Sequence, residues 1–330
     1  DIESGLGRRD PGAVTLPPMM AIAATGNPQF AYEAGRISAE ESRAVGIHFN
    51  LSPVVDVNNN PKNPIINTRS FGEVPDSVNR YSVEFIRGLH DHGMLATAKH
   101  FPGHGDTETD SHSSLAQIPS DSARLWDVEL PPFQKAIDAG VDAVMVAHVN
   151  SPDYQDHAQN PASLSSFWLQ DILREKMNFD GVIITDAMRM GGIVKNYSDE
   201  YALLATVQAG SDIIIQNQNL KKSIDVIEKA VLNGILSESR IDASALKVLK
   251  MKEKVGLHLN KTILAENTHR AMGKAANFKL AQEMAKKAIT LVKNENDILP
   301  LQPTLNEKLY VVDLYDGPNN HSQSSFTKQL

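Results

Sequence analysis

The sequence predicts an α/β protein of the (β/α)8 barrel class, because short apolar runs alternate with amphipathic stretches along the chain. The runs are rich in β-branched residues, as buried parallel strands are. Three of the amphipathic stretches end at Gly93, Gly140 and Gly210, and glycine commonly follows the last turn of a helix. The predicted strands span 47–57, 94–100, 141–149, 180–188 and 211–218, and the predicted helices span 77–93, 123–140, 165–177 and 198–210.

Polar residues stand where the predicted strands end. In a (β/α)8 barrel the carboxyl ends of all strands meet on one face, where the active site lies. A doubly wound open sheet would gather ligands mainly at one switch point. Five successive polar strand ends therefore favour the barrel over the open sheet. These ends carry Asp56, then Lys99 and His100, then His148, then Asp186, then Gln216 and Asn217.

The pattern changes after residue 257. Residues 258–275 form a polar connection, 276–302 predict a helix, a short strand and a proline-bounded turn, and 308–316 predict another strand. So short a stretch with two strands cannot close a core of its own. We therefore expect a barrel domain over 1–257, a linker over 258–275, and the beginning of a truncated second α/β domain over 276–330.

The composition argues against several kinds of partner. The 330 residues carry a formal net charge of −8 and no basic stripe, which argues against a nucleic-acid-binding protein. No apolar run approaches the roughly 18 residues that would span a bilayer. The lack of cysteine excludes disulfides and thiolate chemistry. The first residues lack an initiator methionine and a signal-peptide pattern, so we expect a trimmed chain.

Residues 99–115, KHFPGHGDTETDSHSSL, gather titratable side chains in a segment that proline and glycine keep from forming a helix. Loops rich in such groups commonly carry function. Asp110 stands two positions before His112, so its carboxylate can accept a hydrogen bond from the imidazole, fix its tautomer and raise its basicity. His112 is therefore a candidate proton shuttle, and the glycines of the loop would let it move.

Asp186 directly follows a predicted buried strand, where an unpaired charge is costly. We interpret it as a nucleophile or a metal ligand, with helix capping or pairing to an arginine as the alternative. Lys99 and His100 can donate hydrogen bonds to the hydroxyl groups of a ligand. Arg9 and Arg69 offer planar guanidinium groups for oxygen-rich ligands.

Two other strand ends receive separate interpretations. Asp56 is interpreted as structural, holding the loop that follows its strand. His148 ends a strand in the same ring of polar groups and is expected to contact a ligand.

On these motifs the sequence resembles glycoside hydrolase family 3, and within it the β-N-acetylglucosaminidases of the NagZ type. KHFPGHGDTETDSH, with SPVVDV and TRSFG before it and GVIITDAM after it, matches the family's order over residues 1–257. The resemblance implies an enzyme without metal or cofactor that retains configuration and releases terminal β-linked N-acetylglucosamine, with peptidoglycan fragments as its source. It implies Asp186 as nucleophile, His112 as acid/base assisted by Asp110, and sugar binding by Asp1, Arg9, Arg69, Lys99 and His100.

The resemblance also bears on the ends of the chain. If Asp1 is the family's sugar-binding aspartate, the first strand and helix of the barrel precede this chain. Residues 289–301 resemble the start of the family's second, α/β sandwich domain, and members of that two-domain type are often exported. We therefore expect the periplasm or cell envelope, with the cytoplasm as the alternative.

Three other functions stay open on the sequence. A metal-dependent hydrolase of the same fold could use Asp186 and the histidines at 100, 104, 112 and 148 as ligands. A sugar-binding barrel without catalysis and a phosphorylase that uses phosphate in place of water are the others.

Overall fold

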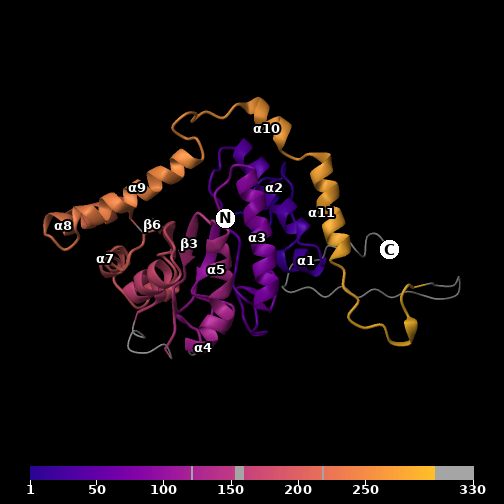
Figure 1. Cartoon of the computed structure of the whole chain (residues 1–330), viewed down its shortest axis with the longest axis horizontal. Helices are drawn as coiled ribbons and strands as arrows, with labels where there is room; N and C mark the ends of the chain where they lie inside the picture. Colours follow the sequence, from indigo (N-terminus) through magenta and orange to yellow (C-terminus); the bar gives the residue numbers. More distant parts are fainter. Residues whose placement is uncertain (120–121, 153–159, 218, 302–330) are drawn as a thin grey trace, which may run out of the picture. The chain divides into compact units, whose positions relative to one another are not determined.

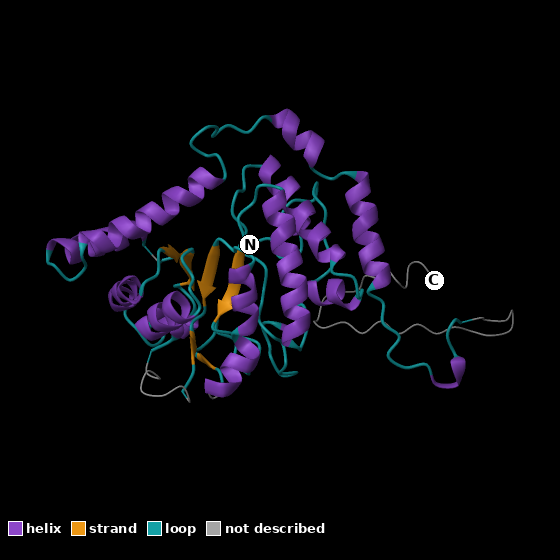
Figure 2. Ribbon diagram, in the orientation of Figure 1, coloured by secondary structure: helices purple, strands orange, loops and turns teal. Residues whose placement is uncertain are grey.

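A parallel sheet of four strands lies at the centre of the N-terminal unit (Figures 1 and 2). The computed structural model describes residues 1–119, 122–152, 160–217 and 219–301. Contacts divide the chain into two units, 1–289 and 290–330, and all described strands lie in the first. The sheet has the order β1-β3-β5-β6, with β1 at Thr97–Phe101, β3 at Ala143–Val146, β5 at Val182–Ala187 and β6 at Ile213–Ile215.

Each strand of this sheet pairs with the next strand of the sheet along the chain. Thr97 lies opposite Ala143, and Ala143 lies opposite Val182. Ile184 lies opposite Ile213. A doubly wound sheet reverses its order at a switch point, whereas a barrel keeps adding strands in one direction. The predicted α/β class with a parallel sheet is confirmed, and the closure of the sheet into a barrel stays a prediction.

The predicted strand at 47–57 lies beside β1 but forms only isolated parallel bridges, Phe49 with Leu95 and Val54 with Lys99. Pro53 lacks an N–H and cannot complete a ladder, so the prediction of a continuous strand is wrong there. The segment nevertheless extends the sheet beyond β1 and ends at Asp56. A second, two-stranded parallel sheet joins β2 (Ala116–Gln117) to β4 (Val149–Asn150).

Helices form at the four predicted stretches, with one change. The stretch at 123–140 is broken into α4, a helical turn and α5, because Pro131 begins a new helix and cannot continue the old one. Gly93, Gly140 and Gly210 all have positive φ, as predicted for residues after a helix. The helices are α1 (Met19–Ala24), α2 (Gln29–Ala44), α3 (Pro75–Asp91), α4 (Ser122–Arg124), α5 (Pro131–Asp138), α6 (Gly191–Val194), α7 (Asp199–Ala209), α8 (Leu220–Leu232), α9 (Glu238–Lys254), α10 (Ala265–Ala271) and α11 (Ala275–Lys287), with helical segments at Leu6–Arg8, Asn67–Arg69, Leu125–Glu129, Ala162–Leu164, Phe167–Lys176 and Glu295–Asp297.

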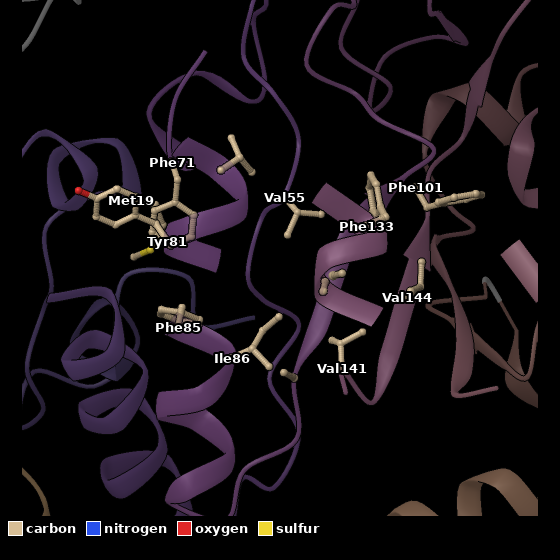
Figure 3. Packing of buried hydrophobic residues seen from close by; sticks show 14 of the residues in the cluster. Met19, Val55, Phe71, Tyr81, Phe85, Ile86, Phe101, Phe133, Val141 and Val144 are labelled. Atoms are coloured by element: carbon tan, nitrogen blue, oxygen red, sulfur yellow. The ribbon is translucent and has the colours of Figure 1, made fainter. Parts of the chain in front are cut away.

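The main apolar core lies between the sheet and the helices that cover it (Figure 3). Helix α3 packs against both α2 and α5. At the end of β1, Phe101 is fully buried with its ring 5.3 Å from and perpendicular to that of Phe133 on α5. Aromatic pairs of this geometry add to the stabilisation that burial gives. This packing fixes the end of β1, where Lys99 and His100 stand.

The C-terminal part differs from the prediction in two places. Helix α10 forms within the predicted polar connection at 258–275, and the short strand predicted within 276–302 does not form in the described residues up to 301. Helix α11 is confirmed. The strand predicted at 308–316 lies outside the described residues, and the domain boundaries at 257 and 275 stay predictions. Within the described residues, no helix has the length and apolar character needed to cross a membrane.

Candidate active site

The polar end of the 47–57 segment and the end of β1 meet at the carboxyl edge of the sheet. Asp56 is fully buried there and accepts hydrogen bonds from the ring Nδ1 of His100 (2.7 Å) and from the backbone N–H of His104 (2.7 Å). Burial raises the pKa of Asp56, but its electrostatic interactions and hydrogen bonds with His100 and His104 outweigh that effect and hold the pKa below its ordinary value. Asp56 is therefore an ionised anchor, which agrees with its structural interpretation.

His100 is oriented by this anchor. Because the Asp56 carboxylate can only accept, Nδ1 of His100 carries the hydrogen that bonds to it. The other ring nitrogen, Nε2, lies 3.3 Å from the NH2 group of Arg69 and accepts from it. The ring thus links the buried anchor to a guanidinium group on the ligand side of the site.

Glu3, which was not among the predicted site residues, bonds to two of the predicted binding residues, Arg69 and Lys99. Its two oxygens accept from Nε (2.9 Å) and NH2 (2.7 Å) of Arg69, in the planar two-bond geometry that suits guanidinium. Lys99 lies between two carboxylates, with Nζ 2.7 Å from Glu3 Oε1 and 2.7 Å from Asp1 Oδ1. Glu3 stands two positions after Asp1 in a non-helical segment, and this spacing was the signal that could have revealed it.

Lys99 is almost fully buried, so its charge needs these partners. Burial lowers the pKa of Lys99, and Glu3 and Asp186 oppose that effect. The pKa of Glu3 falls far below its ordinary value although burial raises it, because Arg69 and Lys99 bond to its carboxylate. The group is a preorganised set of charged hydrogen-bonding atoms.

Asp186 ends β5 with its side chain partly exposed, and its Oδ1 accepts the backbone N–H of Ala187 (2.7 Å). Burial raises the pKa of Asp186, but His100, His148, the Ala187 N–H and Lys99 together hold the pKa below its ordinary value. The side chain is therefore anionic at neutral pH, as a nucleophile must be.

His148 forms a hydrogen bond to the last residue of β5. It is fully buried, with Nδ1 2.7 Å from the hydroxyl of Ser163 and Nε2 3.1 Å from the carbonyl oxygen of Ala187. Burial lowers the pKa of His148, so its ring is neutral at pH 7. Since both nitrogens have protein partners, the predicted ligand contact would require one of these bonds to be replaced.

The pair predicted at i, i+2 in the loop is formed. Asp110 Oδ1 accepts both the backbone N–H (2.8 Å) and ring Nδ1 (2.7 Å) of His112. The His112 side chain is 58% exposed, which leaves Nε2 available to a ligand. His112 lines a hollow of about 480 Å³. The other lining residues come from the N-terminal part of the chain and are Asp1, Ile2, Glu3, Ser4, Gly5, Arg8, Arg9, Pro18, Met19, Ile65, Thr68 and Arg69.

Glycines of the 99–115 loop serve close packing in this structure. A Cβ on Gly105 would lie 1.8 Å from the carbonyl oxygen of Val57, and a Cβ on Gly103 would lie 2.8 Å from the side chain of Glu129. Their small size lets the loop pack closely against neighbouring segments. The sequence predicts only that these glycines let the loop move.

Residues 1–251 match the model of the Glycosyl hydrolase family 3 N terminal domain. The chain belongs to glycoside hydrolase family 3.

Two curated proteins are each about 30% identical to this chain. The β-N-acetylglucosaminidase/β-glucosidase of Cellulomonas fimi is 30% identical over 96% of this chain and 58% of its own length. Beta-hexosaminidase A of Pseudoalteromonas piscicida is 31% identical over 86% of this chain and 50% of its own. This family 3 chain thus spans between half and three-fifths of the length of these curated relatives.

Solved structures with similar sequences share its fold. The family 3 β-N-acetylglucosaminidase from Paenibacillus sp. str. FPU-7 superposes with a TM-score of 0.81 at 39% identity, covering 86% of this chain and 54% of that one. The structure described as beta-glucoside phosphorylase BglX gives a TM-score of 0.84 at 30% identity, covering 88% and 54%. These values support a TIM-type α/β fold for the matched region.

Three of the four histidines named for a metal site, His100, His104 and His148, use both ring nitrogens for protein contacts in this family 3 chain. His104, like His148, has a protein partner on each ring nitrogen, and His100 bonds to an aspartate and an arginine. In the described part of the chain, no three histidine, aspartate or glutamate side chains are placed to hold one metal ion. The donor geometry therefore gives the metal-dependent alternative no support.

His104 is expected to lower the stability of the folded state as the pH falls from about 6.5 to about 4. Burial, aided by the neighbouring His100, lowers the pKa of His104 from 6.5 to about 4. Between these values the unfolded chain binds a proton that the folded chain does not, so the free energy of unfolding rises with pH across this window. The whole effect amounts to about 3 kcal/mol.

The variant His104→Gln removes this titration while keeping a donor and an acceptor for Thr107 and Ser111. Urea unfolding of both proteins between pH 4 and pH 7 measures the difference in slope. We expect a shallower pH dependence in the variant, and identical slopes would contradict the prediction. Carboxylates titrate in the same range in both proteins, so they cancel in this comparison.

Proposed function

We propose that this chain is the catalytic part of a retaining β-N-acetylhexosaminidase that releases terminal β-linked N-acetylglucosamine. The observation that carries the proposal is that His112, held by Asp110, lines one hollow with Asp1, Arg9 and Arg69. A proton shuttle and a set of oxygen-binding groups therefore face the same space. The name of the Paenibacillus relative supports the same substrate class, and the name of the Cellulomonas relative combines it with β-glucosidase activity.

In the first step, a carboxylate oxygen of Asp186 attacks the anomeric carbon as the bond to the leaving oxygen breaks. His112, in its protonated form, gives its proton to that oxygen, which leaves as a hydroxyl group. The product is a covalent glycosyl-aspartate. In the second step His112, now neutral, takes a proton from water as the water oxygen attacks the anomeric carbon and Asp186 leaves as a carboxylate.

The charged group around Glu3 would bind the sugar. Lys99 and Arg69 have donors for hydroxyl oxygens, and Asp1 has an acceptor oxygen. The bonds of Glu3 to Lys99 and Arg69 hold these donors in place before a sugar arrives, which lowers the entropy cost of binding. Arg9, on the same hollow, is proposed to reach the sugar from the other side.

The use of histidine as acid/base bears on the choice of sugar. A carboxylate near the 2-acetamido group would repel the partial negative charge of its oxygen and could promote attack by that oxygen in place of Asp186. A neutral or cationic histidine avoids this repulsion. We therefore propose a strong preference for N-acetylglucosamine over glucose, with peptidoglycan-derived fragments as the natural source.

The full-length protein is expected to hydrolyse a chromogenic β-N-acetylglucosaminide with a much higher kcat/KM than the matching β-glucoside. Release of the β-anomer first, followed in real time by NMR, checks retention through the Asp186 adduct. Comparable kcat/KM on the two sugars would contradict the preference, and an inverted first product would contradict the mechanism.

A phosphorylase is the second candidate, because a structure described as a β-glucoside phosphorylase shares this fold at 30% identity. In that reaction phosphate would attack the glycosyl-aspartate in place of water. Product analysis with and without added phosphate distinguishes the two, since only a phosphorylase forms the sugar 1-phosphate. The closure of the sheet into a barrel belongs to the same proposal and is supported by the strand order β1-β3-β5-β6. The second domain stays a prediction from the sequence.

A further inference from the structure

The loop that carries His112 is held against the segment that follows Asp186. Gly191 donates its N–H to the carbonyl oxygen of His112 (3.0 Å), and Gly192 donates to that of Ser111 (3.2 Å). The two glycines begin helix α6, and the first N–H groups of a helix have no partner within it. The carbonyl groups of His112 and Ser111 accept hydrogen bonds from these two N–H groups, so each segment satisfies hydrogen-bonding groups of the other.

Gly191 leaves no room for a side chain on the loop side. A Cβ there would lie 2.5 Å from the carbonyl oxygen of Ser113 and 2.8 Å from that of His112. Both are main-chain atoms, so a side-chain rotation cannot relieve the contact. A Cβ on Gly192 would come no closer than 3.3 Å to its neighbours. The severe steric conflict is therefore at Gly191.

The docked loop is a compact turn whose backbone is restricted by hydrogen bonds. The N–H groups of Ser113 and Ser114 both donate to the carbonyl oxygen of Asp110, whose side chain holds His112. The buried hydroxyl of Ser111 lies 2.8 Å from Nε2 of His104. The turn is thus tied to the site at Ser111 and to the segment after β5 at Gly191. A shift at either contact would carry the imidazole with it.

We propose that Gly191 is a positioning residue that sets the place of the His112–Asp110 pair relative to Asp186. The inference rests on the proposed glycosidase function. Asp186 stands only five positions before Gly191, so the contact that docks the acid/base loop is close along the chain to the nucleophile. A displacement of about 1 Å at a reacting group can cost about 10²-fold in rate, which makes such a contact consequential.

The test compares Gly191→Ala with Gly181→Ala in the full-length protein. Gly181 precedes the other end of β5, where a Cβ would lie 2.5 Å from the ring of Phe179 and 2.6 Å from the carbonyl oxygen of Asp142. The control therefore adds the same methyl group in an equally crowded place away from the loop. The substrates are aryl β-N-acetylglucosaminides with activated and with poor leaving groups.

We expect Gly191→Ala to lower kcat/KM about 10²-fold on the poor leaving groups and much less on the activated ones, because only the former need the proton of His112. Azide attacks the glycosyl-aspartate without needing a base, so it should restore the kcat on the activated substrates. Gly181→Ala should show no leaving-group dependence beyond that of the unchanged protein. Gly192→Ala, with its milder contact, should show the Gly191→Ala pattern at smaller size.

Amide hydrogen exchange of residues 108–116 provides a readout that does not depend on activity. Exchange should be faster in Gly191→Ala and unchanged in Gly181→Ala. Equal losses on both leaving-group classes, or unchanged exchange of the loop, would overturn the proposal. The full-length protein could cleave none of these glycosides while loop exchange is still faster in Gly191→Ala. That result would overturn the proposed function and would support only the contact between Gly191 and the loop.

Discussion

Replacing Asp186 with asparagine is expected to abolish turnover while leaving the fold intact. An amide cannot attack the anomeric carbon, so the covalent adduct cannot form. The bond from the Ala187 N–H to Oδ1 survives in the variant, which keeps the end of β5 in place. The kcat on a chromogenic β-N-acetylglucosaminide should fall by about 10⁴- to 10⁶-fold. Thermal unfolding of both proteins checks that the fold is unchanged.

A matched control is Asp180→Asn, which changes an exposed aspartate just before β5 that pairs with Lys247. It should retain activity. A mechanism-based fluorosugar should label the unchanged protein on the peptide that contains Asp186. A label on another peptide, or an Asp186→Asn variant with activity within about tenfold of the unchanged protein, would contradict the nucleophile assignment.

The second large effect is expected for His112→Ala, with a loss of about 10²- to 10⁴-fold on substrates with poor leaving groups. The loss should be much smaller where the leaving group departs without a proton. The kcat/KM across an aryl glycoside series measures this dependence. Azide should restore turnover of the activated substrates, because it attacks the glycosyl-aspartate without needing a base.

Asp110→Ala should give the same pattern at smaller size, since it removes the orienting partner and leaves the imidazole in place. His92→Ala is the matched control, because His92 lies next to Glu40, 3.4 Å away, just after helix α3, and takes no part in the site. It should change none of these rates. Losses of equal size on good and poor leaving groups for both His112→Ala and Asp110→Ala would mean that the pair is structural.

Features that depend on neighbours in the chain could be predicted from the sequence. The alternation of strands and helices follows from local apolar periodicity, and the parallel sheet with its helices is confirmed. The Asp110–His112 pair spans only two positions, so a single turn of backbone brings the two side chains together. Asp186 could be singled out because an unpaired carboxylate directly after a buried strand is energetically costly.

Features that depend on distant segments could not be predicted in this way. Glu3 gains its role from Lys99 and Arg69, which lie far along the chain and reach it only once the sheet has formed. His148 has the same local pattern as other strand-end residues, yet the structure uses both of its ring nitrogens to support β5. Local sequence does not specify which of several polar strand ends will face a ligand.

The sequence by itself determined the class of fold, the positions of most strands along the chain and the two groups proposed for catalysis, since each is encoded in short-range spacing. Only the tertiary structure decided how those groups are held. Gly191 illustrates the difference: in the sequence it is one of two glycines after a strand, and in the structure its missing Cβ makes room for the loop of His112. Steric fit between segments is a property of their packing, and that property exists only after the chain has folded.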